Sequence, residues 1–259
     1  MLLFTVMIIV VLGLSGAEAV QPSILAKRLT EQRWQRVRQH GPQVTPEVTI
    51  WEVYGEGSFR WRFSADYAES HIGAWAVSEV SPERGVMFLA GTSKEQRPPS
   101  RFHVLSVEFL EAGVRLGEEL YQGVPLTHRE GVPHVSRAEH AAVTTDQRAR
   151  FFPLWRSLTA STWQSVAAPP PGDPDVYAFD RDGQYTAYFA TTRCQYAGTW
   201  SLFTSGGETG ELRFSVPGHR CDPRGPRDAF IREMPITLQD HKLFLAQTVY
   251  EPRPQEEVR

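Results

Sequence analysis

The chain has 259 residues, of which 41% are hydrophobic and 22% are charged, proportions that exclude wholesale disorder and a multi-span membrane protein. Its formal net charge of -3 supplies no overall positive field for nucleic acid or for an anionic membrane surface. With 20 Gly and 19 Pro, the chain has enough turn formers to separate many short strands.

An apolar run opens the chain. Residues Leu2 to Leu14 are nearly all apolar, and Ala17-Glu18-Ala19 follows them with the small-residue pattern of a signal-peptide cleavage site. The run is shorter than the about 20 residues that a membrane-spanning helix needs. We therefore predict a signal peptide over residues 1–19, export to the periplasm or the exterior, and no membrane span after cleavage. An uncleaved anchor and a buried core segment are the alternatives.

The second half of the chain repeats the motifs of the first half in the same order. The changes in offset between matched segments fall between candidate strands, where insertions are tolerated, so the pattern indicates an internal duplication. The matched segments are 29–37 with 158–166, 46–48 with 174–176, 56–59 with 182–185, 73–75 with 198–200, 85–89 with 210–214 and 114–121 with 243–250.

Each copy has the alternating pattern of β-strands. Every second residue from Phe59 to Phe63 is aromatic and arginines lie between them, which places the rings on one face of a strand. Residues 200–202 and 212–214 repeat this alternation in the second copy, and Glu56-Gly57 and Asp182-Gly183 are turn dipeptides directly before a strand. We expect about seven short strands in each copy, arranged as a meander.

Four motifs of the second copy resemble the small lipocalin-like domains of bacterial exported proteins. The resemblance implies an all-β fold of two tandem antiparallel meander β-barrels or half-barrels, in a family where most members have no established activity and some relatives hold an apolar ligand. In the first copy, Gly55-Glu56-Gly57 stands where the family has Asp-Gly. The four motifs are Leu158 to Trp163, Phe179 to Tyr185, Gly198 to Trp200 and Leu243 to Tyr250.

The resulting organisation is a domain over residues 20–122, a linker over 123–157, a second domain over 158–251 and a flexible tail over 252–259. One helix is predicted in the linker, from the N-cap Ser136 to Phe152, with Pro153 directly after its end. We expect the most apolar linker residues to cover the end of a barrel. These residues are Phe151, Phe152, Leu154 and Trp155.

The barrel interior is the main candidate for a functional site. Closing a sheet buries its apolar face and removes exposed edges, and about eight strands leave an interior that side chains fill or that holds one small ligand. Both outcomes stay open from the sequence. The bulky residues that would plug the interior or line a cavity are Phe59, Trp61, Trp75, Phe88, Tyr185, Trp200 and Phe214.

Catalytic and metal-binding motifs are absent from the sequence. It contains no Gly-x-Ser-x-Gly, His-Glu-x-x-His, Walker loop or Cys-x-x-Cys pattern, so we expect no catalytic residue, no cofactor and no metal. His128, His134 and His140 do not share one helix face, and the adjacent Glu118 and Glu119 point to opposite faces of a strand. Both groups are interpreted as solvated polar residues.

Cys194 and Cys221 are the two cysteines, and in an exported chain they predict a structural disulfide. A reactive or metal-bound thiol is the alternative.

The predicted function is non-enzymatic binding or scaffolding at the bacterial envelope or exterior. The expected partner is a small apolar ligand or an envelope protein, and no nucleic acid. A true carrier of a small apolar molecule is one alternative. An enzyme with its site in the groove between the two domains is another, since pockets favour domain interfaces.

Overall fold

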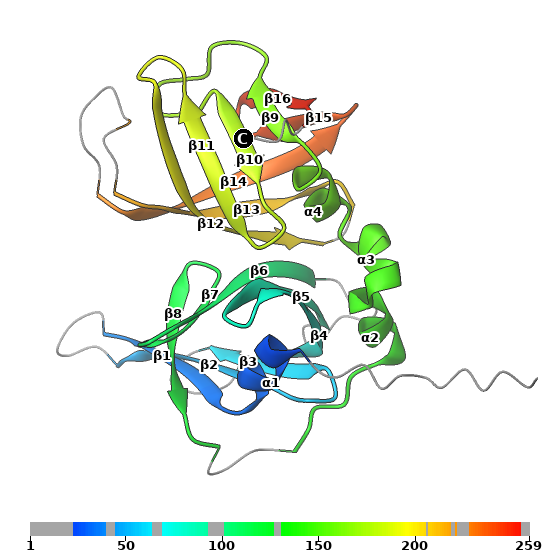
Figure 1. Ribbon diagram of the computed structural model, residues 1–259. Helices are drawn as coiled ribbons and strands as arrows, with labels where there is room; N and C mark the ends of the chain where they lie inside the picture. Colours follow the sequence, from blue (N-terminus) through cyan, green and yellow to red (C-terminus); the bar gives the residue numbers. More distant parts are fainter. Residues whose placement is uncertain are drawn as a thin grey trace, which may run out of the picture.

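The computed structural model (Figure 1) describes residues 23–39, 45–63, 69–92, 101–126, 131–205, 207–218, 221 and 228–254. The predicted signal peptide, His128 and residues 255–259 of the predicted tail lie outside these ranges. Within them, no helix has the length and apolar character that crossing a membrane requires.

The described residues are mostly β, with 56% strand and 13% helix. The first half contains α1 (Ile24–Thr30), β1 (Arg33–Arg38), β2 (Glu47–Val53), β3 (Ser58–Phe63), β4 (Glu69–Ser81), β5 (Arg84–Thr92), β6 (Arg101–Leu110), β7 (Gly113–Leu116) and β8 (Glu119–Val124). The linker contains α2 (Arg137–Val143), α3 (Thr145–Phe151) and α4 (Pro153–Leu158). The second half contains β9 (Thr162–Ser165), β10 (Val176–Phe179), β11 (Gln184–Phe189), β12 (Cys194–Thr204), β13 (Thr209–Val216), β14 (Phe230–Gln239), β15 (Lys242–Leu245) and β16 (Thr248–Arg253).

Strands β1 to β8 close into an eight-stranded antiparallel barrel. Each strand pairs with the next one in chain order, and β8 returns to pair with β1. Closure leaves one face of the sheet in the interior and one outside. The prediction of a mostly β protein with an antiparallel barrel is thus confirmed, with eight described strands in this half where the sequence suggested about seven.

Strands β9 to β16 are also antiparallel neighbours in chain order, and β16 pairs with β9. The two halves meet where β12 pairs with β6 (Figure 1). Strand β7 pairs with β6 only from Val107 to Leu110. The edge of β6 from Phe102 to Leu105 is therefore not paired with β7, and β12 forms hydrogen bonds with it.

The two halves repeat the same hydrogen bonds at corresponding positions. Trp34 Nε1 donates to the Leu29 carbonyl at 2.9 Å, and Trp163 Nε1 donates to the Leu158 carbonyl at 3.1 Å. Each leucine lies in the short helix that precedes the strand carrying the tryptophan. The repeated motif in the sequence thus corresponds to a repeated contact between a helix and a strand.

A glycine recurs on the fourth strand of each half because an aromatic ring of the preceding strand occupies the adjacent space. A Cβ on Gly73 would lie 2.8 Å from the Phe59 ring, and a Cβ on Gly198 would lie 2.8 Å from the Tyr185 ring. A backbone carbonyl of the next strand would be closer still in both halves. No side chain larger than hydrogen fits there without moving the sheet.

The linker contains three short helices instead of the single predicted helix. Ser136 caps α2 as predicted, since its Oγ accepts from the Glu139 N–H at 3.2 Å and its own N–H donates to Glu139 at 2.7 Å. The backbone then leaves the helical region at Thr144, with ψ 151°, and at Phe152, with ψ 53°. A proline disfavours the helical region for the residue before it, so Pro153 breaks the helix at Phe152 and starts α4.

The linker helices run along one side of the molecule from the first half to the second (Figure 1). Phe152 packs against Phe88 and Phe102 on the outer face of β5 and β6, with ring centroids 5.2 and 5.5 Å apart. Leu154 belongs to the same buried cluster as the interior residues of the second half. The apolar linker residues therefore bridge the two halves.

Cys194 and Cys221 form the predicted disulfide, with a sequence separation of 27. It joins the start of β12 to the segment that follows β13.

Candidate ligand cavity

The β1–β8 barrel contains a cavity of about 240 Å³, which has room for about eight water molecules at liquid density. Apolar and aromatic side chains make up most of its lining. They are Trp51, Phe59, Trp61, Leu89, Leu105, Leu116, Tyr121 and, from the second half, Phe203.

The polar lining residues gather at one end of the barrel, called the mouth here. They come from the first residues of β4, β6 and β8 and from the turn before β8, and an antiparallel barrel places these positions at the same end. The second half adds an arginine from β13. The mouth residues are His71, Arg101, His103, Glu118, Glu119 and Arg213.

An aromatic ladder forms one wall of the cavity. Trp51, Trp61 and His71 are direct partners on β2, β3 and β4. The two indoles stack with centroids 5.7 Å apart, and the Trp61 indole stacks on the His71 ring at 5.0 Å. Because the faces of the rings lie against one another, their edges border the cavity. Trp61 Nε1 is buried and has no hydrogen-bond partner among the described residues.

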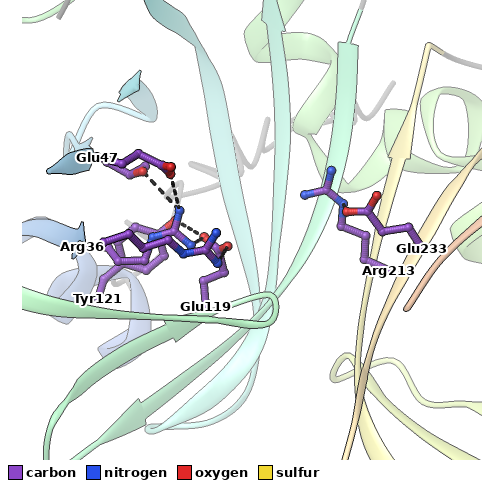
Figure 2. Close-up of polar contacts among 8 residues, drawn as sticks. Arg36, Glu47, Glu119, Tyr121, Arg213 and Glu233 are labelled. Carbon is purple, nitrogen blue, oxygen red and sulfur yellow. Dashed lines mark hydrogen bonds and ion pairs between the residues drawn. The ribbon is translucent and has the colours of Figure 1, made fainter. Parts of the chain in front are cut away.

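A cluster of charged residues lies inside the barrel next to the cavity (Figure 2). Arg36 is on the same face of β1 as the buried Trp34 and forms ion pairs with Glu119 and, at 3.5 Å, with Glu47. Arg38 binds the other oxygen of Glu119 at 2.8 Å. Burial lowers the pKa of Arg36. Two guanidinium groups therefore hold the Glu119 carboxylate.

Glu118 lies at the contact between the two halves. Ser201 on β12 donates a hydrogen bond to its carboxylate, and burial raises the pKa of Glu118. The interpretation of Glu118 and Glu119 as solvated charges is corrected by these contacts. Glu118 lies in the turn between β7 and β8, and Glu119 is the first residue of β8, so the alternation of a continuous strand does not apply to the pair.

His103 is the most strongly perturbed ionisable group at the mouth. Burial is the main cause, and the positive charges of Arg101, His71 and Arg213 add to it, lowering the pKa of His103 to about 3. Its ring contacts Phe203 of the second half edge-on, with centroids 4.8 Å apart. His103 is therefore neutral at physiological pH and lies in a positive electrostatic field.

Aromatic side chains fill the interior of the second half. The Phe214 ring stacks on Tyr177 at 5.6 Å and meets the Tyr185 ring edge-on at 5.0 Å. Phe214 pairs with Trp200 on the neighbouring strand, just as Leu89 pairs with Trp75 in the first half. The first half thus has an aliphatic side chain at the position where the second half has a ring.

Two of the seven residues expected to plug or line a barrel, Phe59 and Trp61, border the cavity. Trp75 faces the same interior and donates to the Tyr54 carbonyl at 2.9 Å, whereas Phe88 is on the opposite face of β5 and packs against the linker. The remaining three, Tyr185, Trp200 and Phe214, belong to the filled interior of the second half.

The sequence reasoning missed the charged and polar residues of the interior. Arg36 follows Trp34 by two positions, and His103 precedes Leu105 by two. An ionisable residue in phase with apolar inward-facing neighbours is the signal that could have identified them. No group of three or more metal-ligating side chains occurs among the residues with a described position.

Comparison with protein-family models and with curated proteins finds no match for this chain.

Proposed function

We propose that the protein binds a small, largely apolar molecule inside the β1–β8 barrel and that β9–β16 form a second, filled barrel of the same lipocalin-like module. The cavity carries this proposal, because it is lined mostly by apolar and aromatic side chains and has polar groups at one end. Ligand sites of proteins have this composition, with a few polar groups that orient the ligand. The proposed role is non-enzymatic binding by an exported protein.

The repeated contacts support the tandem arrangement. The strand pairings have the same register in both halves, since Trp51 pairs with Trp34 and Trp61, and Tyr177 pairs with Trp163 and Ala187. Trp51 and Tyr177 are thus counterparts, which corrects the sequence match of 46–48 with 174–176 by two positions. The halves differ in their interiors, since Phe214 occupies the place of Leu89. We infer a division of roles in which the first copy holds the ligand and the second completes the mouth with Phe203 and Arg213.

The disulfide supports export, because disulfides form and persist in oxidising compartments.

Calorimetric titration with naphthalene-2-carboxamide, a neutral aromatic probe, tests the proposal. We expect one probe molecule to bind each wild-type chain. Leu89→Phe should weaken binding by at least about tenfold, because it introduces into the cavity the ring that Phe214 places in the second half. Leu120→Phe is the matched control, since Leu120 is exposed on β8 and outside the cavity lining.

Absence of binding to the folded wild-type protein would overturn the proposal. Equal binding by wild type and Leu89→Phe would also overturn it, because the probe would then occupy some other surface. Circular dichroism of each variant verifies that the fold is retained.

A further inference from the structure

We propose that the ligand of the β1–β8 cavity is an aromatic carboxylate whose ring lies among the apolar lining residues and whose carboxylate pairs with Arg101 at the mouth. This inference rests on the proposed function and adds the chemical class of the ligand.

The aromatic ladder favours an electron-rich ligand. An aromatic ring is positive at its edge and negative on its face, and the ladder of Trp51, Trp61 and His71 turns its edges to the cavity. Such a wall attracts the face of another ring or an anionic oxygen. The Trp61 Nε1–H, which is buried without a partner among the described residues, is a donor for an oxygen of the ligand.

Arg101 supplies a cation at the mouth. It is the first residue of β6, is exposed, and forms no ion pair with any residue in the described part of the chain. Its direct partner on β5 is Gly91, which also borders the cavity. A Cβ on Gly91 would lie 3.3 Å from the Phe59 ring, so Phe59 and Arg101 border the same part of the cavity.

The other charges near the mouth already have partners. Arg213 forms an ion pair with Glu211 at 3.2 Å. It forms a second one, at 3.0 Å, with Glu233, which lies beside it in Figure 2. Glu119 lies between Arg36 and Arg38. Among the described residues of the mouth, Arg101 is therefore the guanidinium without a carboxylate partner.

Glu118 at the mouth already has a partner in the second half. Its carboxylate accepts a hydrogen bond from Ser201, and burial raises its pKa. The electrostatic potential around His103 is positive, since Arg101, His71 and Arg213 each lower the pKa of His103. A cationic ligand would meet this positive field.

A carboxylate matches the geometry of one guanidinium, because the two groups form a pair of parallel hydrogen bonds. The small volume of the cavity, about 240 Å³, limits the apolar part to a compact body such as one fused ring pair. Naphthalene-2-carboxylate is the corresponding probe.

The test compares three probes of the same shape by calorimetric titration at pH 7.5: naphthalene-2-carboxylate, naphthalene-2-carboxamide and 2-naphthylmethylammonium. We expect the carboxylate to bind wild type at least about tenfold more tightly than the amide, and the ammonium to bind most weakly. Arg101→Gln should abolish the preference for the carboxylate. Arg137→Gln, at an exposed position of α2, should preserve it.

Added salt provides an independent readout, since screening weakens charge pairing and should reduce binding of the carboxylate but not of the amide. Equal or tighter binding of the amide or the ammonium would overturn the ligand class, as would a preference that survives in Arg101→Gln. If the amide binds in a manner sensitive to Leu89→Phe and no charge preference exists, the proposed function stands and only this inference fails. If no probe binds, the proposed function itself fails.

Discussion

Tyr177 stacks on Phe214 inside the second half, with ring centroids 5.6 Å apart and ring planes 18° from parallel. The corresponding residues of the first half, Trp51 and Leu89, border the cavity. The second half has the aromatic Phe214 where the first half has the aliphatic Leu89. This difference contributes to the filled interior of one half and the cavity in the other.

Exchanging these side chains should have opposite effects in the two halves. Phe214→Leu removes ring contacts from a filled interior and should lower the free energy of unfolding by about 1.5 kcal/mol. Leu89→Phe places a ring next to an existing cavity and should change stability by less than about 1 kcal/mol. Urea unfolding of both variants measures the difference. Equal losses in the two variants would mean that the space beside Leu89 is already occupied.

Gly183 should tolerate alanine less well than Gly57, its counterpart in the repeat. Both have positive φ, +82° and +87°, so alanine strains both backbones by about 1 kcal/mol. At Gly183 the new Cβ would lie 2.4 Å from Cβ of Ser106 in the other half, whereas at Gly57 the nearest atom is 3.5 Å away. We expect Gly183→Ala to loosen the contact between the halves.

The rate of limited proteolysis in the linker is measured for both alanine variants. Urea unfolding of the same variants measures the loss of stability from the backbone strain that they share. Faster cleavage of Gly183→Ala than of Gly57→Ala is the expected result. Identical cleavage rates would show that the halves do not depend on this contact.

Glu118 should make the stability of the protein depend on pH. Its pKa is raised from the ordinary 4.5, chiefly by burial, so the folded state binds the proton more tightly than the unfolded state. The contribution of Glu118 is fully present below pH 4.5 and is lost as the pH rises through the raised pKa. Glu118→Gln cannot ionise and should gain stability relative to wild type over this range.

Urea unfolding between pH 4.5 and 8 measures this difference, and Glu111→Gln, at an exposed turn position, is the control. A difference between wild type and Glu118→Gln that stays constant with pH would contradict the predicted titration.

Removing the disulfide should destabilise the second half. Cys194 and Cys221 close a loop with a sequence separation of 27, and the chain-entropy model assigns such a loop about 3 to 4 kcal/mol. The double variant Cys194→Ser with Cys221→Ser should lose this amount in urea unfolding. Wild type in a reducing agent should match the double variant, and a loss confined to one of the two samples would contradict the explanation.

Local patterns predicted the strands well because they act over a few residues. The alternation around Trp61 places alternate side chains on one face, and Gly57 and Gly183 adopt the positive φ that their turn positions suggested. The linker helix was predicted at its start, where Ser136 and Glu139 cap it within one turn. The interruptions of this helix at Thr144 and Phe152 were not predicted. Pro153 was interpreted as following the end of the helix, whereas it also starts α4.

The sequence by itself determined the alternating strands, the order of the repeated motifs and the pairing of the two cysteines. Only the tertiary structure decided which half is hollow, that Arg38 meets Glu119 from 81 positions away, and that Ser201 reaches Glu118 from 83. The physical reason is distance along the chain: strand alternation arises from neighbouring residues, whereas the filling of an interior depends on side chains that closure of the sheet brings together.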